Sequence, residues 1–230
     1  MSVLLLRLAG PLQSWGSASR FARRETNAEP TKSGVLGLLA AALGKRRTDP
    51  IEELLGLTFG VRVDQPGSII QDFHTARDHN GKSMPLTRRF YLSDALFIAG
   101  LEGSDPLIET LDAAVRSPQF PLFLGRRSCP PSGQVSLGTR ENGVEEALRT
   151  EEWHAADWYR RQTRARQVAL RIVRDARPDE EGITQRDVPV SFDPIRREYG
   201  WRTVVEPPPH IVENDLGSEG YHDPLSALGG

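Results

Sequence analysis

The chain has 230 residues, enough for one substantial domain or one domain with a small appendage, and with 38% hydrophobic and 26% charged residues its composition is that of a folded rather than a disordered chain. Its single cysteine, Cys129, excludes an intrachain disulfide and a cysteine metal cluster, and no stretch reaches the roughly 20 apolar residues of a membrane-spanning helix. The net charge is −2, but five acidic and no Lys or Arg residues lie from Glu206 onward, so the remainder carries +3 and a nucleic-acid partner is not excluded.

The first elements are a strand and a helix. The short apolar run over 2–10, closed by Gly-Pro, predicts a buried strand. The segment 31–44 predicts a helix, because Thr31 or Ser33 can cap it, Leu and Ala fill it and Gly44 ends it. These two elements open the predicted fold.

The rest of the first half alternates between strands and helices. In chain order the patterns predict a short helix at 49–57, strands at 58–64 and 68–76, a strand at 90–103 and a helix at 104–118. The segment 120–133 predicts a short strand or extended piece followed by an arginine turn. The segment 77–89, RDHNGKSMPLTRR, is polar, basic and built around Asn-Gly, so we expect a hairpin tip or inserted arm there. The order strand, helix, strand, strand, helix, strand predicts a ferredoxin-like α+β fold.

The second half predicts a smaller, β-containing part. VEEALRTEEW predicts a short helix, RQVALRIVRD and GWRTVVEP predict strands, and PVSFDPIRREYG predicts an extended piece and a turn. We therefore expect a first domain over 1–133 with an arm at about 75–90, and a part over 134–205 that completes or extends the sheet. The Pro/Gly-rich acidic end, 206–230, predicts a flexible tail.

No motif for a cofactor or a metal is present. A GxxxxGK[ST] loop, GxGxxG and HExxH are all absent, and the five histidines lack metal-ligand spacing, so we expect neither cofactor nor metal. The aromatic signature of proteins that bind RNA on their sheet face is also absent, which favours binding through loops and the arm. The cysteine content suits a reducing cytoplasm, and the apolar run of MSVLLLRLAG is too short for a signal peptide.

Four segments occur in a distinctive order: LRLAGPLQSWG, PTKSGVLGLLAAALG, DFHTAR and FLGRRSCP, with a weaker continuation in QRDVP…F…REY. Together they resemble the fifth CRISPR-associated protein family of the RAMP superfamily in its type I-E form. The resemblance implies a ferredoxin-like (RRM-type, RAMP) fold with an inserted β-hairpin thumb.

The resemblance also implies a function in antiviral defense. It implies a non-catalytic subunit of the CRISPR interference complex, Cascade, that binds the 5′ handle of the crRNA and caps the filament of CasC subunits. Such a subunit helps to seat the large subunit, CasA, and meets target DNA only indirectly, through the complex. In a related subtype the family member itself cleaves the precursor RNA, so a metal-independent endoribonuclease is the alternative.

Two polar segments are candidate RNA contacts. A glutamine amide and a serine hydroxyl can bond base edges or phosphate, and an indole can stack on a splayed base, which favours the loop residues Gln13, Ser14 and Trp15. The alternative is that the indole packs beneath its own loop. The helix entrance offers free N–H groups, hydroxyls and a lysine, which favours phosphate binding by Thr31, Lys32 and Ser33, unless this is an ordinary cap.

Arginine-rich segments provide further candidates. The arm carries basic residues that can meet a backbone, namely Arg77, Lys82, Arg88 and Arg89. Its far side carries residues that can wedge between bases or insert beneath a neighbouring subunit, namely Met84, Pro85 and Leu86; the alternative is a mobile, solvated hairpin. Arg126 and Arg127 suit phosphate or guanine, although consecutive extended residues alternate in direction and a salt bridge is the alternative.

His74 is the one candidate for acid–base catalysis. Beside a basic arm, an imidazole can act as the base for attack by a ribose 2′-OH. No second acid is evident beside His74, and the resemblance implies a non-catalytic subunit, so a structural or RNA-contacting histidine is the favoured interpretation.

Overall fold

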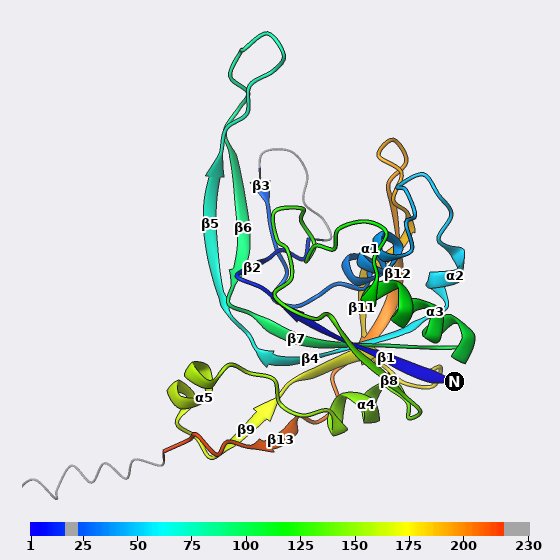
Figure 1. Cartoon of the computed structure of the whole chain (residues 1–230), viewed down its shortest axis with the longest axis vertical. Coiled ribbons are helices and arrows are strands. Elements are labelled where there is room, and N and C mark those ends of the chain that lie inside the picture. The colour runs from blue at the N-terminus through cyan, green and yellow to red at the C-terminus, as the bar shows by residue number, and fades with distance from the viewer. Residues whose placement is uncertain (17–22, 219–230) are drawn as a thin grey trace, which may run out of the picture.

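The computed structural model describes residues 1–16 and 23–218. Its centre is a seven-stranded antiparallel sheet in the order β11-β12-β10-β4-β7-β1-β8 (Figure 1). The strands are β1 (Ser2–Ala9), β4 (Thr58–Gln65), β7 (Leu96–Gly103), β8 (Ser136–Arg140), β10 (Ile172–Asp175), β11 (Ile183–Ser191) and β12 (Glu198–Val205).

Helices cover both faces of this sheet. The helices are α1 (Lys32–Ala42), α2 (Glu52–Leu55), α3 (Asp105–Arg116), α4 (Val144–Thr150) and α5 (Asp157–Thr163). Alternate residues of β1 enter two apolar clusters, because Leu4 and Leu6 pack with α1 and α3 while Val3 and Leu5 pack with α4. Burial on both faces explains why β1 is a continuous apolar run rather than an alternating one.

The predicted order of the first six elements is present, but its last strand was misplaced. The chain runs β1, α1, β4, β7, α3 and β8, and these four strands lie side by side as β8-β1-β7-β4. The sixth element is Ser136–Arg140, whereas the predicted piece at 120–133 forms no strand. Pro121, Pro130 and Pro131 lack the backbone N–H that a sheet ladder requires. The arginine turn predicted in this segment is present, closed by a hydrogen bond from the Cys129 N–H to the Arg126 carbonyl.

A second, smaller sheet forms a projecting arm. It pairs β5 (Ser68–His74) with β6 (Thr87–Ser93), and β6 also pairs with β2 (Leu12–Gln13) and β3 (Arg23–Arg24). The single strand predicted at 90–103 divides at Asp94, which has a positive φ of 55°, so that β6 leaves the main sheet. Figure 1 shows the β5–β6 hairpin extending well beyond the rest of the molecule, with the predicted segment 77–89 at its outer end.

The second half extends the sheet, and part of the predicted tail is ordered. Strands β10, β12 and β11 follow β4 at one edge. The prediction of a flexible tail from 206 onward is wrong for β13 (His210–Glu213), which pairs with β9 (Gln167–Leu170). Asn214 secures this strand by donating to the carbonyls of Arg160 and Ala165. The tail residues 219–230 lie outside the described residues, and none of the described helices is both long and apolar enough to cross a membrane.

Candidate nucleic-acid interface

The loop after β1 is part of the core rather than an exposed RNA contact. Gln13 Nε2 donates to the carbonyls of Leu8 (3.0 Å) and Ala95 (2.7 Å), and Gln13 Oε1 accepts from Trp15 Nε1 at 3.0 Å. Ser14 Oγ donates to the Phe90 carbonyl, and all three predicted residues are buried. The structure contradicts the prediction that Gln13, Ser14 and Trp15 present polar groups to RNA, because their polar groups satisfy one another and the backbone of neighbouring strands.

The entrance of α1 is likewise occupied by the protein itself. Thr31 Oγ1 accepts from Gly34 N at 3.2 Å, and the backbone N–H of Lys32 donates to Asp187 Oδ2 at 2.9 Å. The Asp187 carboxylate, which comes from β11, therefore fills the position that the sequence assigned to a phosphate. Thr31 and Ser33 are buried beside it, so the alternative of a structural cap is the correct one for Thr31, Lys32 and Ser33.

Lys32 belongs to a buried ionic cluster that joins α1 to the C-terminal strands. Lys32 Nζ donates to Asp175 Oδ2 at 2.8 Å, and Arg202 bridges Asp175 Oδ1 (2.6 Å) and Asp187 Oδ1 (2.5 Å). Burial by itself lowers the pKa of the Arg202 guanidinium. The hydrogen bonds and charge of Asp187 outweigh burial and raise the pKa of Arg202 above its usual value. The two cations and two carboxylates thus balance each other without a ligand.

We expect Lys32→Ala to lower the free energy of unfolding by about 2 kcal/mol, because it removes a charged hydrogen bond while Arg202 still compensates Asp175. Urea denaturation measures this loss, and Lys82→Ala, at the exposed arm tip, is the control that should leave stability unchanged. A Lys32→Ala protein of normal stability that no longer binds RNA would restore the phosphate-binding role.

A group of arginines meets at the base of the arm. We call it the basic ridge, and it consists of Arg23, Arg24, Arg88, Arg89 and Arg126. Strand β3 lies parallel to β6, so that Arg23 faces Arg88 and Arg24 faces Arg89. The two pairs project from opposite faces of the small sheet, because successive strand residues alternate in direction. Like charges that face each other across strands are destabilising. Among residues 1–16 and 23–218, two carboxylates oppose them, namely Glu25, bound to Arg23 at 2.8 Å, and Asp72, which faces Arg89 from β5. The ridge therefore carries an excess of positive charge that suits a polyanion.

Arg126 connects this ridge to the turn that precedes Cys129. Its Nη1 donates to the Phe90 carbonyl (3.1 Å) and its Nη2 to the Arg24 carbonyl (2.8 Å), and the guanidinium lies over the Tyr91 ring at 4.7 Å. These partners are neutral, and Arg126 forms no salt bridge to a carboxylate in residues 1–16 and 23–218. Arg126 thus positions β3 against β6 and adds its charge to the ridge, whereas Arg127 lines a groove beside α1.

The outer arm exposes both charge and apolar surface. Its tip turns at Asp78, whose Oδ1 accepts from the N–H groups of Asn80 and Lys82. The residues predicted to contact RNA or a partner are exposed here, namely Arg77, Met84, Pro85 and Leu86. Ile69 and Phe73 of β5 are also more than half exposed, which the prediction of a strand at 68–76 did not anticipate.

His74 and Cys129 occupy very different environments. His74 is exposed at the outer end of β5, where the Thr87 hydroxyl donates to its carbonyl. Cys129 is fully buried, and burial raises the pKa of its thiol, so the neutral form dominates at pH 7. The geometry therefore provides no activated nucleophile at Cys129.

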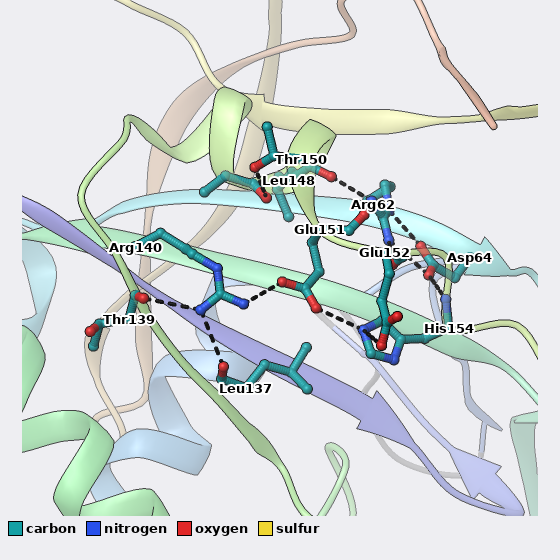
Figure 2. A network of polar contacts seen from close by, with 11 residues as sticks. Arg62, Asp64, Leu137, Thr139, Arg140, Leu148, Thr150, Glu151, Glu152 and His154 are labelled. Atoms are coloured by element: carbon teal, nitrogen blue, oxygen red, sulfur yellow. Dashed lines mark hydrogen bonds and ion pairs between the residues drawn. The ribbon is translucent and has the colours of Figure 1, made fainter.

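A second polar network, shown in Figure 2, is structural. Arg62 of β4 forms a buried ion pair with Asp64, with Nε 2.6 Å from Oδ1. Its other donors reach the carbonyls of Leu148, Glu151 and Glu152, each at 2.6 Å. These carbonyls lie at the end of α4 or just beyond it, where helices leave acceptors unpaired, so Arg62 satisfies them from the sheet.

Three side chains in this network have metal-ligand chemistry, namely Glu151, Glu152 and His154. Glu151 is already bound, because its Oε2 lies 2.5 Å from Arg140 Nη2 and its Oε1 lies 2.9 Å from His154 Nε2. Burial raises the pKa of Glu151, but the hydrogen bonds from His154 and Arg140 outweigh it and hold the pKa below the usual value. The ionised Glu151 is thus compensated by the protein, and the cluster fastens α4 to the sheet.

The fold and the ridge define an α+β protein with a large antiparallel sheet and a basic arm, and comparison with known proteins identifies the class as CRISPR-associated. The family described as "CRISPR-associated protein (Cas_Cas5)" matches residues 3–205, and the chain belongs to this family. The resemblance found in the sequence motifs is thereby confirmed.

Individual relatives agree with this assignment. The CRISPR system Cascade subunit CasD of Escherichia coli (strain K12) is 39% identical over 160 residues, which span 60% of this chain and 71% of that protein. A solved structure described as "Crystal structure of Cas protein" is 38% identical, covers 95% of this chain and 98% of its own, and has a TM-score of 0.69. A chain of a "CRISPR RNA-guided surveillance complex" is 31% identical, covers 98% and 97%, and has a TM-score of 0.74.

Proposed function

We propose that this chain is a non-catalytic, cytoplasmic subunit of a type I-E Cascade complex that binds the 5′ handle of the crRNA on the basic ridge. The observation that carries the proposal is the pairing of Arg23 with Arg88 and of Arg24 with Arg89. Such a ladder of like charges costs stability in the free protein and is relieved by a phosphate backbone. Family membership and the CasD relative support RNA as the polyanion.

The architecture supports the remaining parts of the proposal. We propose that β8-β1-β7-β4 with α1 and α3 is a ferredoxin-like core, since this strand order and alternation match that fold. The β5–β6 arm is then the thumb, and its exposed Met84 and Leu86 contact a neighbouring subunit. In this arrangement the chain caps the CasC filament, helps to seat CasA and meets target DNA only through the assembled complex.

The direct experiment is isolation of the assembled complex with its RNA. We expect a discrete RNA with a uniform 5′ end to co-purify with the chain, because a subunit that grips one end protects it from trimming. Recovery of RNA with heterogeneous 5′ ends would count against 5′-end binding.

The endoribonuclease alternative is tested separately. Repeat RNA incubated with the purified chain in EDTA is expected to stay intact, measured by gel electrophoresis, and His74→Ala is expected to behave like the unsubstituted chain. His79→Ala, exposed on the same arm, is the matched control. Cleavage in EDTA that is lost in His74→Ala and kept in His79→Ala would instead establish His74 as a catalytic base.

A further inference from the structure

A groove lies along α1, outside the residues assigned to the ridge. Its volume is about 760 Å³, within the range of small-molecule binding sites. One wall is the small-residue face of α1, formed by Gly34, Gly37, Ala40 and Ala41, and the opposite walls include Phe123 and Phe192. A Cβ at Gly37 would lie 3.4 Å from Phe192 Cζ, so the absence of a side chain at this position keeps the groove open.

The chemistry of this α1 groove is that of a site for an unpaired nucleotide. Its interior offers the half-buried aromatic rings of Phe123 and Phe192, on which a base can stack. Exposed arginines line it, namely Arg46, Arg47, Arg127 and Arg197. Within the described part of the chain these four guanidinium groups pair with no carboxylate, so they remain available for phosphates.

The groove and the basic ridge are linked by one turn of the chain. Arg127 lines the groove, and its neighbour Arg126 is bound to the carbonyls of Phe90 and Arg24 in the ridge. The turn that carries both arginines is held in place, because Gly125 has a positive φ of 83° and any Cβ there would overlap the Ser14 carbonyl. A strand whose phosphates follow the ridge as far as Arg126 is therefore one residue from the groove at Arg127.

We infer that the α1 groove receives one or two unstacked bases of the same single-stranded RNA whose backbone the ridge holds. The inference rests on the proposed function and adds to it a place where bases, and not only phosphates, are contacted. Phosphates lie at the arginine rim and bases lie against the aromatic interior, because a charged phosphate is not stabilised among apolar walls. Binding here selects unpaired RNA, since a base within a duplex cannot enter the groove.

The test fills the groove without changing its charge. Gly37→Leu places a side chain against Phe192, and Gly37→Ala is the matched control that improves helix propensity but leaves most of the volume free. Fluorescence anisotropy measures binding of the full chain to a fluorescein-labelled, single-stranded RNA of about ten nucleotides from the CRISPR repeat. A second RNA has the same sugar–phosphate backbone but carries abasic sites. Thermal unfolding checks the fold of each variant, and Ala41→Met, on the same wall, repeats the test if Gly37→Leu disturbs α1.

We expect Gly37→Leu to weaken binding of the intact RNA by about 5- to 100-fold, with the salt dependence unchanged, because one or two stacked bases are lost while phosphate contacts remain. Gly37→Ala should bind within about twofold of the unsubstituted chain, and the abasic RNA should not distinguish the variants.

Normal binding by folded Gly37→Leu and Ala41→Met, with loss on charge reversal of the ridge, would overturn the groove inference and leave the proposed function standing. Normal binding after both kinds of substitution would overturn both.

Discussion

The double substitution Arg24→Glu and Arg88→Glu is expected to lower the affinity for single-stranded RNA by on the order of a hundredfold. Each change removes a phosphate contact from the basic ridge and introduces a repulsive charge. The folded state should not be weakened, because the like-charged pairs Arg23–Arg88 and Arg24–Arg89 become pairs of opposite charge. Loss of binding without loss of stability is therefore the signature of a surface built for a polyanion.

This prediction is measured by titrating RNA at several salt concentrations. Two lost phosphate contacts should reduce the slope of log K against log salt by about 1.4, at roughly 0.7 per contact on a single strand. Arg161→Glu is the matched control, since Arg161 is an exposed arginine on α5, far from the arm (Figure 1). Unchanged affinity and slope in the double variant would show that the ridge is not the RNA site.

The largest loss of stability is expected for Asp64→Ala, at about 3–5 kcal/mol in the free energy of unfolding. Arg62 and Asp64 are both fully buried, and the substitution leaves the guanidinium charge without its partner (Figure 2). It also removes the acceptor for the backbone N–H of His154, which Asp64 Oδ2 binds at 2.7 Å. The attachment of α4 and of the turn after it to the sheet should weaken together.

Urea denaturation of the full chain measures this effect. The control is Arg161→Ala, which breaks an exposed ion pair with Asp157 and should change stability by less than about 0.5 kcal/mol. A loss below about 1 kcal/mol for Asp64→Ala would mean that Arg62 is compensated by the carbonyls of Leu148, Glu151 and Glu152 alone.

Some elements could be predicted because their causes are local. The apolar run of β1, the cap and the small residues of α1, and the Asn-Gly turn of the arm each act within a few residues. The position of the sixth element, strand β8, could not be predicted from local causes. The segment 120–133 is apolar enough for a strand, but its prolines prevent ladder pairing, and Ser136–Arg140 pairs with β1 despite a weaker pattern.

The candidate site, too, was only partly predictable from local features of the sequence. Positive charge in several short groups predicted a phosphate-binding surface, and the fold pairs Arg24 with Arg89 while Arg126 donates to the Arg24 carbonyl. Gln13 and Lys32 looked equally suitable as ligands, but they are bound to partners distant in the sequence, Ala95 and Asp175. A side chain's own type and neighbours do not reveal whether a distant segment will bury it.

The sequence by itself determined the family, the α+β class and the existence of a basic arm, because ordered motifs, apolar periodicity and charge are properties of short stretches of chain. Only the tertiary structure decided which polar groups are available to a ligand. Asp187 of β11 caps α1, although the two are distant in the sequence. Strand β3 lies against β6 and pairs arginines from two distant parts of the chain. Availability depends on which distant groups become neighbours, and that is a property of the packed fold.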